Sequence, residues 1–164
     1  GKNVLDLGCG TGYGSYILSR VAKGVTGVDR SEEALSIAST SFSASNIAYV
    51  HSDIPSFVAQ GLDGFDVTVC LETLEHLSLE VRQDVLDRLS SPVIIISFPT
   101  PKFLSTSKFH YADIRLIPIL QSLWRKGYEI ILSLQYPSGE ISETVDRVDA
   151  QNYFIVAKRK ASSH

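Results

Sequence analysis

One short stretch, Val4-Leu5-Asp6-Leu7-Gly8-Cys9-Gly10-Thr11-Gly12-Tyr13-Gly14-Ser15, determines how the rest of the chain can fold. Its apolar start is typical of a parallel strand that is buried on both faces. The glycines at every second position from 8 to 14 predict a turn whose backbone takes positive φ angles and lies directly against a ligand. A helix predicted from Ser15 to about Ala22 would direct its first N–H groups at that ligand.

The spacing of the glycines separates three kinds of nucleotide-binding turn. The dinucleotide fingerprint G-x-G-x-x-G requires a glycine at position 13 if it begins at Gly8, and that position is Tyr13. A phosphate-binding loop of the form G-x-x-x-x-G-K-[ST] does not occur in the sequence. An acidic residue followed by glycines two, four and six positions later does occur, as Asp6, Gly8, Gly10 and Gly12.

This arrangement resembles the first motif of the class I S-adenosylmethionine-dependent methyltransferases. The resemblance implies an α/β fold with a Rossmann-like, seven-stranded mixed sheet of strand order 3-2-1-4-5-7-6 and helices on both faces. It implies S-adenosylmethionine as the cofactor, bound in part by the residues of the turn: Asp6, Gly8, Cys9, Gly10 and Gly12. Domains of this family usually begin with one or two cap helices, which we expect to be missing here because the predicted strand starts at once.

Composition limits the class of protein. With 164 residues and 44% hydrophobic content, the chain has material for one core, so we expect a single domain over 1–164. A net charge of −3, with both signs scattered, argues against binding to nucleic acid or to an anionic membrane. The longest apolar run, Val93–Ile96, is far shorter than the roughly 20 residues that span a bilayer. Cys9 and Cys70 are expected to be free thiols in a reducing compartment, the cytoplasm.

The rest of the chain alternates short apolar runs with helical patterns, which predicts strands joined by crossovers. The polar linker at 137–151 excludes a helical crossover, so the last two strands are predicted to form an antiparallel hairpin. The predicted strands cover 4–7, 25–29, 47–51, 65–71, 93–98, 128–136 and 152–160. Helices are predicted at 15–22, after an N-cap at Ser31, after Ser78, and at 117–127 with Pro118 in the first turn.

Asp29 closes the second predicted strand, 21 residues after Gly8. In a doubly wound nucleotide-binding fold, a carboxylate at this position accepts hydrogen bonds from the ribose hydroxyls. Asp29 and the adjacent Arg30 are therefore candidate cofactor-binding residues. The alternative is that Asp29 caps the helix that begins near Ser31.

Two further segments are assigned to the cofactor by the resemblance alone. It implies that Asp53, after the third strand, accepts from the adenine amino group and that Ile54 packs on the adenine ring. The alternative for Asp53 is a turn aspartate ahead of Pro55. The resemblance also implies that Leu71 and Glu72, after the fourth strand, border the methionine end of the cofactor.

Glu72, Glu75 and His76 have the spacing i, i+3, i+4, so a helical segment would place all three side chains on one side. Two carboxylates and an imidazole on one turn make a candidate site for a divalent metal ion. The string Glu-x-x-Glu-His is similar to the metal-binding motif of the O-methyltransferases of ubiquinone biosynthesis and of the small-RNA 2′-O-methyltransferases. His110, after the long loop at 99–109, is a candidate fourth ligand.

A metal-free interpretation stays open, because the same Leu-Glu-His-Leu string is similar to that of many small-molecule methyltransferases without a metal. In that case Glu75 is structural, and His76 is a general base for a substrate hydroxyl, with an ordinary pKa of about 6.5. A third interpretation makes His76 a purely local packing residue.

These observations favour an S-adenosylmethionine-dependent methyltransferase that acts on a small molecule, with oxygen as the preferred acceptor. Methyl transfer from a sulfonium is an in-line displacement, so the protein's main task is to position the two reactants. The loop at 99–109 is expected to border the acceptor pocket. Two alternatives remain: a metal-assisted RNA 2′-O-methyltransferase, and a cofactor-binding subunit that is not catalytic.

Overall fold

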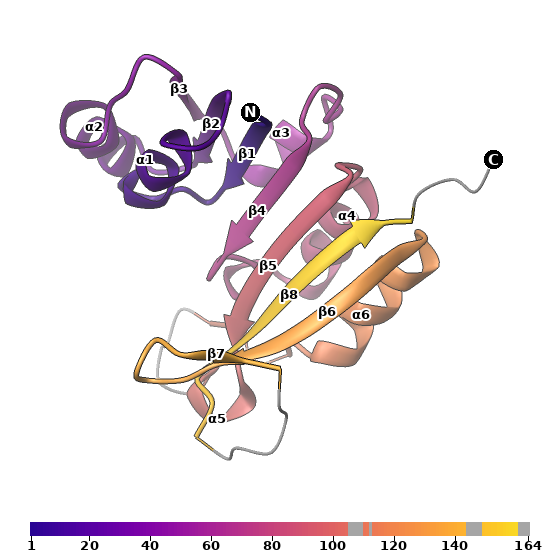
Figure 1. Cartoon of the computed structure of the whole chain (residues 1–164). Coiled ribbons are helices and arrows are strands. Elements are labelled where there is room, and N and C mark those ends of the chain that lie inside the picture. Colours follow the sequence, from indigo (N-terminus) through magenta and orange to yellow (C-terminus); the bar gives the residue numbers. More distant parts are fainter. Residues whose placement is uncertain (105–109, 112, 144–148, 161–164) are drawn as a thin grey trace. The chain divides into compact units, whose positions relative to one another are not determined.

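The computed structural model describes residues 1–104, 110–111, 113–143 and 149–160 (Figure 1). The chain divides into two compact units, one made of 1–70 with 88–92 and the other of 71–87 with 93–164. Each unit has its own elements and its own buried side chains, and each is described by itself below. A single domain over 1–164 therefore stays a prediction.

The first unit is built on parallel strands. They are β1 (Asn3–Leu7), β2 (Gly24–Asp29), β3 (Ile47–His51) and β4 (Val67–Leu71), of which β4 ends at the boundary with the second unit. Their order is β3-β2-β1-β4, and every pairing is parallel. Leu5, Leu7 and Val28 are fully buried in this sheet. The predicted order of the first four strands is confirmed.

Three helices connect these strands: α1 (Tyr13–Ser19), α2 (Glu32–Ser41) and α3 (Ile54–Val58). Helix α1 ends three residues earlier than predicted, because the N–H groups of Arg20 and Val21 bond carbonyls only three residues back and close the last turn. The N-cap prediction for α2 is confirmed, since the Ser31 side chain accepts from the N–H of Ala34 at 3.1 Å. Helix α3 was not predicted, because five residues are too few to show a helical period.

The second unit is built on antiparallel strands. They are β5 (Val93–Pro99), β6 (Tyr128–Gln135), β7 (Ile141–Ser142) and β8 (Asn152–Arg159), in the order β5-β8-β6-β7. The last long strand lies between β5 and β6, as the predicted order 5-7-6 requires. The extra strand β7 lies in the polar linker and was missed, because two residues carry no alternating pattern.

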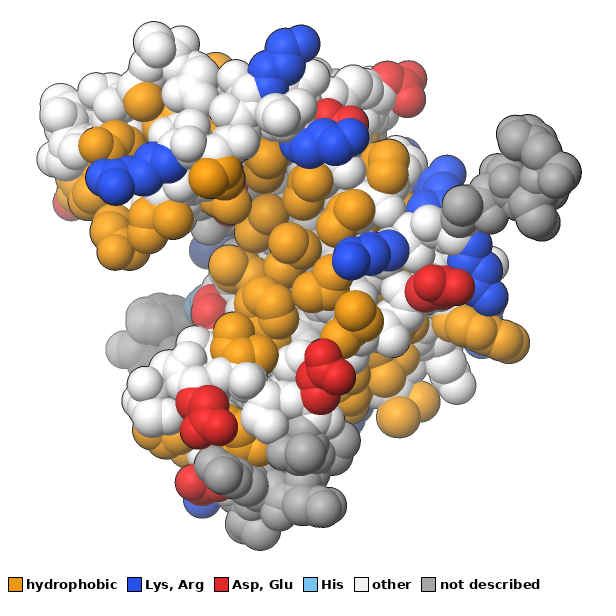
Figure 2. All heavy atoms as spheres, in the orientation of Figure 1, with side chains coloured by type: hydrophobic (Ala, Val, Ile, Leu, Met, Phe, Trp, Pro, Cys, Tyr) orange, Lys and Arg blue, Asp and Glu red, His pale blue; other side chains and the backbone are white. Residues whose placement is uncertain are grey.

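The helices of the second unit are η1 (Leu74–His76, a 3₁₀ turn), α4 (Leu79–Arg88), α5 (Pro101–Leu104) and α6 (Leu116–Arg125). Helices α4 and α6 lie on one side of the strands in Figure 1, and the same sheet buries Ile94, Ile96 and Ile155 completely. Figure 2 shows hydrophobic side chains gathered on the other side, over β5, β8 and β6. Of the loop predicted at 99–109, α5 occupies part and 105–109 lie outside the described residues.

No helix within the described ranges is long and apolar enough to cross a membrane.

Candidate functional site

The glycine turn after β1 has the backbone that its sequence predicted. Gly8, Gly10 and Gly12 have φ angles of 76°, 52° and 85°, a region that residues with a Cβ rarely adopt. The N–H groups of Gly8 and Cys9 both donate to the carbonyl of Val28, at 2.8 and 3.1 Å, and join the turn to β2. A Cβ at Gly10 would meet no heavy atom within 4 Å, so open space lies beside the backbone there.

Gly12 has a second reason to be glycine, besides its positive φ. A Cβ at this position would lie 2.5 Å from Tyr49 Oη and 2.6 Å from Ala38 Cβ. Tyr49 Oη itself donates to the carbonyls of Gly12 and Phe42, at 3.3 and 2.8 Å. The turn thus presents open backbone at Gly10 and packs tightly against β3 and α2 at Gly12.

Asp6 lies behind the turn as a buried support. Ser15 Oγ, at the start of α1, donates to Asp6 Oδ2 at 2.6 Å, and both side chains are buried. Burial raises the pKa of Asp6, against the lowering effect of the Ser15 bond. Burial, with the nearby charges of Asp6 and Asp29, also raises the pKa of the Cys9 thiol to about 12, so this thiol is not a nucleophile at neutral pH.

Asp29 links the turn to the start of α2. Its Oδ2 accepts from the N–H of Gly10 at 2.8 Å, and its Oδ1 accepts from the N–H of Ser31 at 2.9 Å. Ser31 supplies the N-cap of α2, so Asp29 is not the cap. Each carboxylate oxygen can accept a second bond, which leaves acceptor capacity for a ligand hydroxyl. The neighbouring Arg30 is exposed.

Asp53 is the N-cap of the short helix α3, whereas its alternative interpretation was a turn aspartate ahead of Pro55. Its two carboxylate oxygens accept from the N–H and the Oγ of Ser56, at 2.8 and 2.9 Å, and these bonds lower its pKa. Ile54 is 8% exposed and packs in the core of the first unit. A role of these two residues toward an adenine ring stays a prediction.

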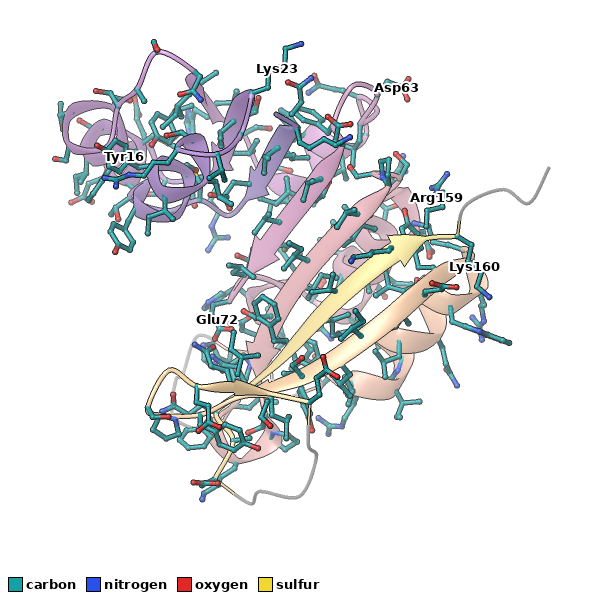
Figure 3. The ribbon with its side chains drawn as sticks, in the orientation of Figure 1. Tyr16, Lys23, Asp63, Glu72, Arg159 and Lys160 are labelled. Carbon is teal, nitrogen blue, oxygen red and sulfur yellow. The ribbon has the colours of Figure 1, made fainter. Side chains whose placement is uncertain are left out.

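In the second unit, Glu72 departs from the predicted geometry. It has a φ of 50° and is the one non-glycine residue in the described ranges with a positive φ. It lies beside the end of β5, where its N–H donates to the carbonyl of Ser97 at 3.1 Å and its Oε1 accepts from Ser97 Oγ at 2.5 Å (Figure 3). Partial burial raises its pKa, against the lowering effects of Ser97 and His110. The preceding Leu71 is 40% exposed.

The helical spacing predicted for Glu72, Glu75 and His76 is therefore wrong, because the 3₁₀ turn η1 begins only at Leu74. The group that the structure brings together is Glu75, His76 and His110, with one potential ligand atom from each within 4.8 Å of the others. The rings of His76 and His110 are 5.0 Å apart between centroids. The predicted fourth ligand, His110, thus lies in the group, while Glu72 does not.

Two atoms of this group, which we call the Glu75–His76–His110 cluster, lack a hydrogen-bond partner. Glu75 Oε2 and His110 Nδ1 are buried and have no partner in the described structure. A buried polar atom without a partner costs roughly 1–3 kcal/mol, so such atoms are uncommon in folded proteins. Burial, with a smaller contribution from Glu72, raises the pKa of Glu75 to about 7.

Sequence analysis missed one residue that supports the cluster. Arg82, on α4, is 3% exposed, and its guanidinium donates to backbone carbonyls at both ends of η1. The available signal was its position: with Leu86 and Leu89 it has the spacing i, i+4, i+7, which places a charge on the apolar face of the helix. A buried charge requires partners.

Comparison with known proteins gives two kinds of match. A family model described as a methyltransferase domain matches residues 4–92. The ubiquinone biosynthesis O-methyltransferase of Aromatoleum aromaticum (strain DSM 19018 / LMG 30748 / EbN1) is 40% identical over 79 residues, which are 47% of this chain and 34% of that protein. This chain spans about a third of the length of the curated relatives it matches.

Solved structures match nearly the whole chain. A SAM-dependent methyltransferase from Archaeoglobus fulgidus superposes with a TM-score of 0.76 at 18% identity, over 96% of this chain and 86% of that one. The N-methyltransferase NodS from Bradyrhizobium japonicum WM9, in complex with S-adenosyl-L-homocysteine, superposes with a TM-score of 0.75 at 17% identity, over 98% and 79%. At this identity the likeness shows the fold, and the predicted Rossmann-like methyltransferase fold is confirmed.

Proposed function

This chain belongs to the methyltransferase domain family, and from that premise we propose that it transfers the methyl group of S-adenosylmethionine to an oxygen atom of a small molecule. The glycine turn is the observation that supports S-adenosylmethionine as the cofactor. The 40% identity to a ubiquinone biosynthesis O-methyltransferase supports oxygen as the acceptor. The fold alone does not select the acceptor atom, since the NodS N-methyltransferase shares it.

The residues of the first unit suit the cofactor. The backbone at Gly10 faces open space, and a side chain there would occupy it. We propose that the turn from Gly8 to Gly12 binds the cofactor through its backbone and that Asp29 accepts from the ribose hydroxyls. When bound, S-adenosylmethionine supplies the methyl group on a positively charged sulfur. Asp6 and Ser15 act behind the turn, where their buried hydrogen bond holds α1 against β1.

The Glu75–His76–His110 cluster suits a divalent metal ion. One carboxylate and two imidazoles form a donor set that favours Mn²⁺, Co²⁺ or Zn²⁺ over Mg²⁺, which prefers oxygen ligands. Such an ion would satisfy the unpartnered Glu75 Oε2 and His110 Nδ1. A bound divalent ion would act as a Lewis acid that lowers the pKa of an acceptor hydroxyl.

If the reaction does not use a metal ion, His76 is the candidate for removing the proton of the acceptor. Its side chain is exposed, unlike that of Glu75, and it lies on the short turn η1 beside His110. A neutral imidazole can accept the proton of a hydroxyl and so act as a general base. The same cluster would serve an RNA 2′-hydroxyl equally well, so the acceptor has to be tested directly.

The test is an assay with two acceptors, a simple catechol and a short single-stranded RNA with a free 3′-terminal ribose, each with S-adenosylmethionine. We expect a mass increase of one methyl group on the catechol, together with stoichiometric S-adenosylhomocysteine. Methylation of the RNA alone would replace the small-molecule proposal with the RNA alternative. Binding of S-adenosylhomocysteine without methylation of either acceptor would support the non-catalytic subunit.

A further inference from the structure

Arg82 is a buried cation whose hydrogen bonds join two separate segments of the second unit. Its side chain is 4% exposed, and its guanidinium offers only hydrogen-bond donors. Nε donates to the carbonyl of Leu74 at 3.0 Å, and Nη2 donates to the carbonyl of Leu77 at 2.7 Å. These carbonyls belong to the first residue of η1 and to the residue just after its last. The guanidinium is therefore hydrogen-bonded to both ends of the turn that carries Glu75 and His76.

The same guanidinium reaches the segment that carries His110. Arg82 Nη2 donates to Asp113 Oδ1 at 2.9 Å, and Asp113 lies three residues after His110. A second bond runs in parallel, from the N–H of Tyr111 to the carbonyl of Glu75 at 2.7 Å. Between these two bonds, the backbone around His110 is held directly against η1.

We propose that the ion pair of Arg82 and Asp113 positions His110 against Glu75 and His76, so that the cluster is preorganised before any ligand binds. The proposal rests on the proposed function of the cluster as a metal site, but the placement of His110 can be measured without a metal. Arg82 and Asp113 touch no reacting atom and are therefore positioning residues.

The arrangement of charges explains why arginine occupies this position. Burying a guanidinium costs free energy unless its N–H groups are hydrogen-bonded. Here two carbonyls and one carboxylate accept from Arg82. Lysine would supply the charge without the planar fork of donors. We call the ion pair of Arg82 and Asp113, together with the bonds from Arg82 to η1, the clamp. It depends on the shape of the guanidinium as well as on its charge.

Asp113 is the better residue to change, because its side chain is 46% exposed and its loss should leave the chain folded. The variants are Asp113→Ala, the conservative Asp113→Asn, which keeps an oxygen acceptor, and the matched control Glu129→Ala, which removes an exposed carboxylate from β6. Far-UV circular dichroism and thermal melting establish that each variant is folded.

The first readout is the nuclear Overhauser effect between the ring protons of His76 and His110 in the metal-free chain. We expect it in the unaltered chain and in Glu129→Ala, a loss in Asp113→Ala, and partial recovery in Asp113→Asn. The second readout is titration with Co²⁺, followed by its visible absorption. Loss of a supporting partner typically weakens metal binding roughly 10- to 100-fold, and we expect this for Asp113→Ala but not for Glu129→Ala.

The two readouts separate the clamp from the metal. A ring contact that persists unchanged in Asp113→Ala overturns the clamp, whatever happens with Co²⁺. A contact that is lost in Asp113→Ala, in a chain that binds no Co²⁺ even when unaltered, supports the clamp and overturns the metal site. Loss of the contact together with weaker Co²⁺ binding supports both.

Discussion

The carboxylate of Asp29 accepts a 2.8 Å hydrogen bond from the N–H of Gly10, and this bond connects the end of β2 to the middle of the glycine turn. The bond holds Gly10 at a φ of 52° while leaving the space beside its Cα open. One side chain therefore shapes the turn and also offers its remaining acceptor sites to a ligand.

Replacing Asp29 with alanine should weaken the binding of S-adenosylhomocysteine roughly 10- to 100-fold, because charge-assisted hydrogen bonds contribute about 1.5–3 kcal/mol. Isothermal titration calorimetry measures this. Asp63→Ala, which removes an exposed carboxylate from the same unit, should leave the dissociation constant unchanged. An equal dissociation constant in both variants would restrict Asp29 to supporting the turn.

Alanine at Gly10 and at Gly12 should have different effects. At Gly10 the cost is the strain of a positive φ, roughly 1–2 kcal/mol, and the main loss should be cofactor affinity. At Gly12 the same strain adds to a clash with Tyr49 and Ala38, so the melting temperature should fall further. Thermal melts without ligand compare the two, and equal shifts would contradict the assignment of open space to Gly10.

Glu75 should make the stability of the metal-free chain depend on pH. Its pKa is about 7 in the folded chain against 4.5 for the ordinary group, so the folded state binds the extra proton between these values. The free energy of unfolding therefore falls as the pH rises from about 4.5 to 7 and stays lower above that. Glu75→Gln removes this loss and should stabilise the chain at pH 8.5 by roughly 1–3 kcal/mol, but little at pH 5. Urea unfolding at both pH values tests the difference, and an equal effect at both would refute it.

If the Glu75–His76–His110 cluster binds an ion that the reaction needs, excess chelator should abolish methylation while S-adenosylhomocysteine still binds. Activity should return with Mn²⁺, Co²⁺ or Zn²⁺. If methylation instead persists in chelator and His76→Ala reduces it, the result supports His76 as the general base. Full turnover in His76→Ala would leave the histidine a structural role.

The glycine turn was predictable because positive φ angles strongly favour glycine, so three of them leave a visible pattern in the sequence itself. The long strands were predictable for a similar reason, because a short apolar run rich in β-branched residues, such as Val93–Ile96, is typical of a buried strand. Helix α3 and strand β7 were missed because they are too short for any period to appear.

The cluster was predictable only in part. The sequence indicated His76, Glu75 and His110, but it suggested a helical turn that would also include Glu72. The structure gives Glu72 a left-handed backbone and a bond to Ser97, a residue 25 positions away that no local pattern connects to it. Arg82 shows the same limit, because its partners become visible only when η1 and the segment after His110 are brought together.

The raised pKa of Cys9 has a practical consequence for labelling. With a pKa of about 12, its thiol is almost entirely protonated at pH 7.5, and iodoacetamide or maleimide reagents react with the thiolate. The other cysteine, Cys70, is completely buried. A cysteine introduced at an exposed position, such as Asp63, should therefore react selectively in the otherwise unaltered chain, so that a single fluorophore can be attached without first removing the native thiols.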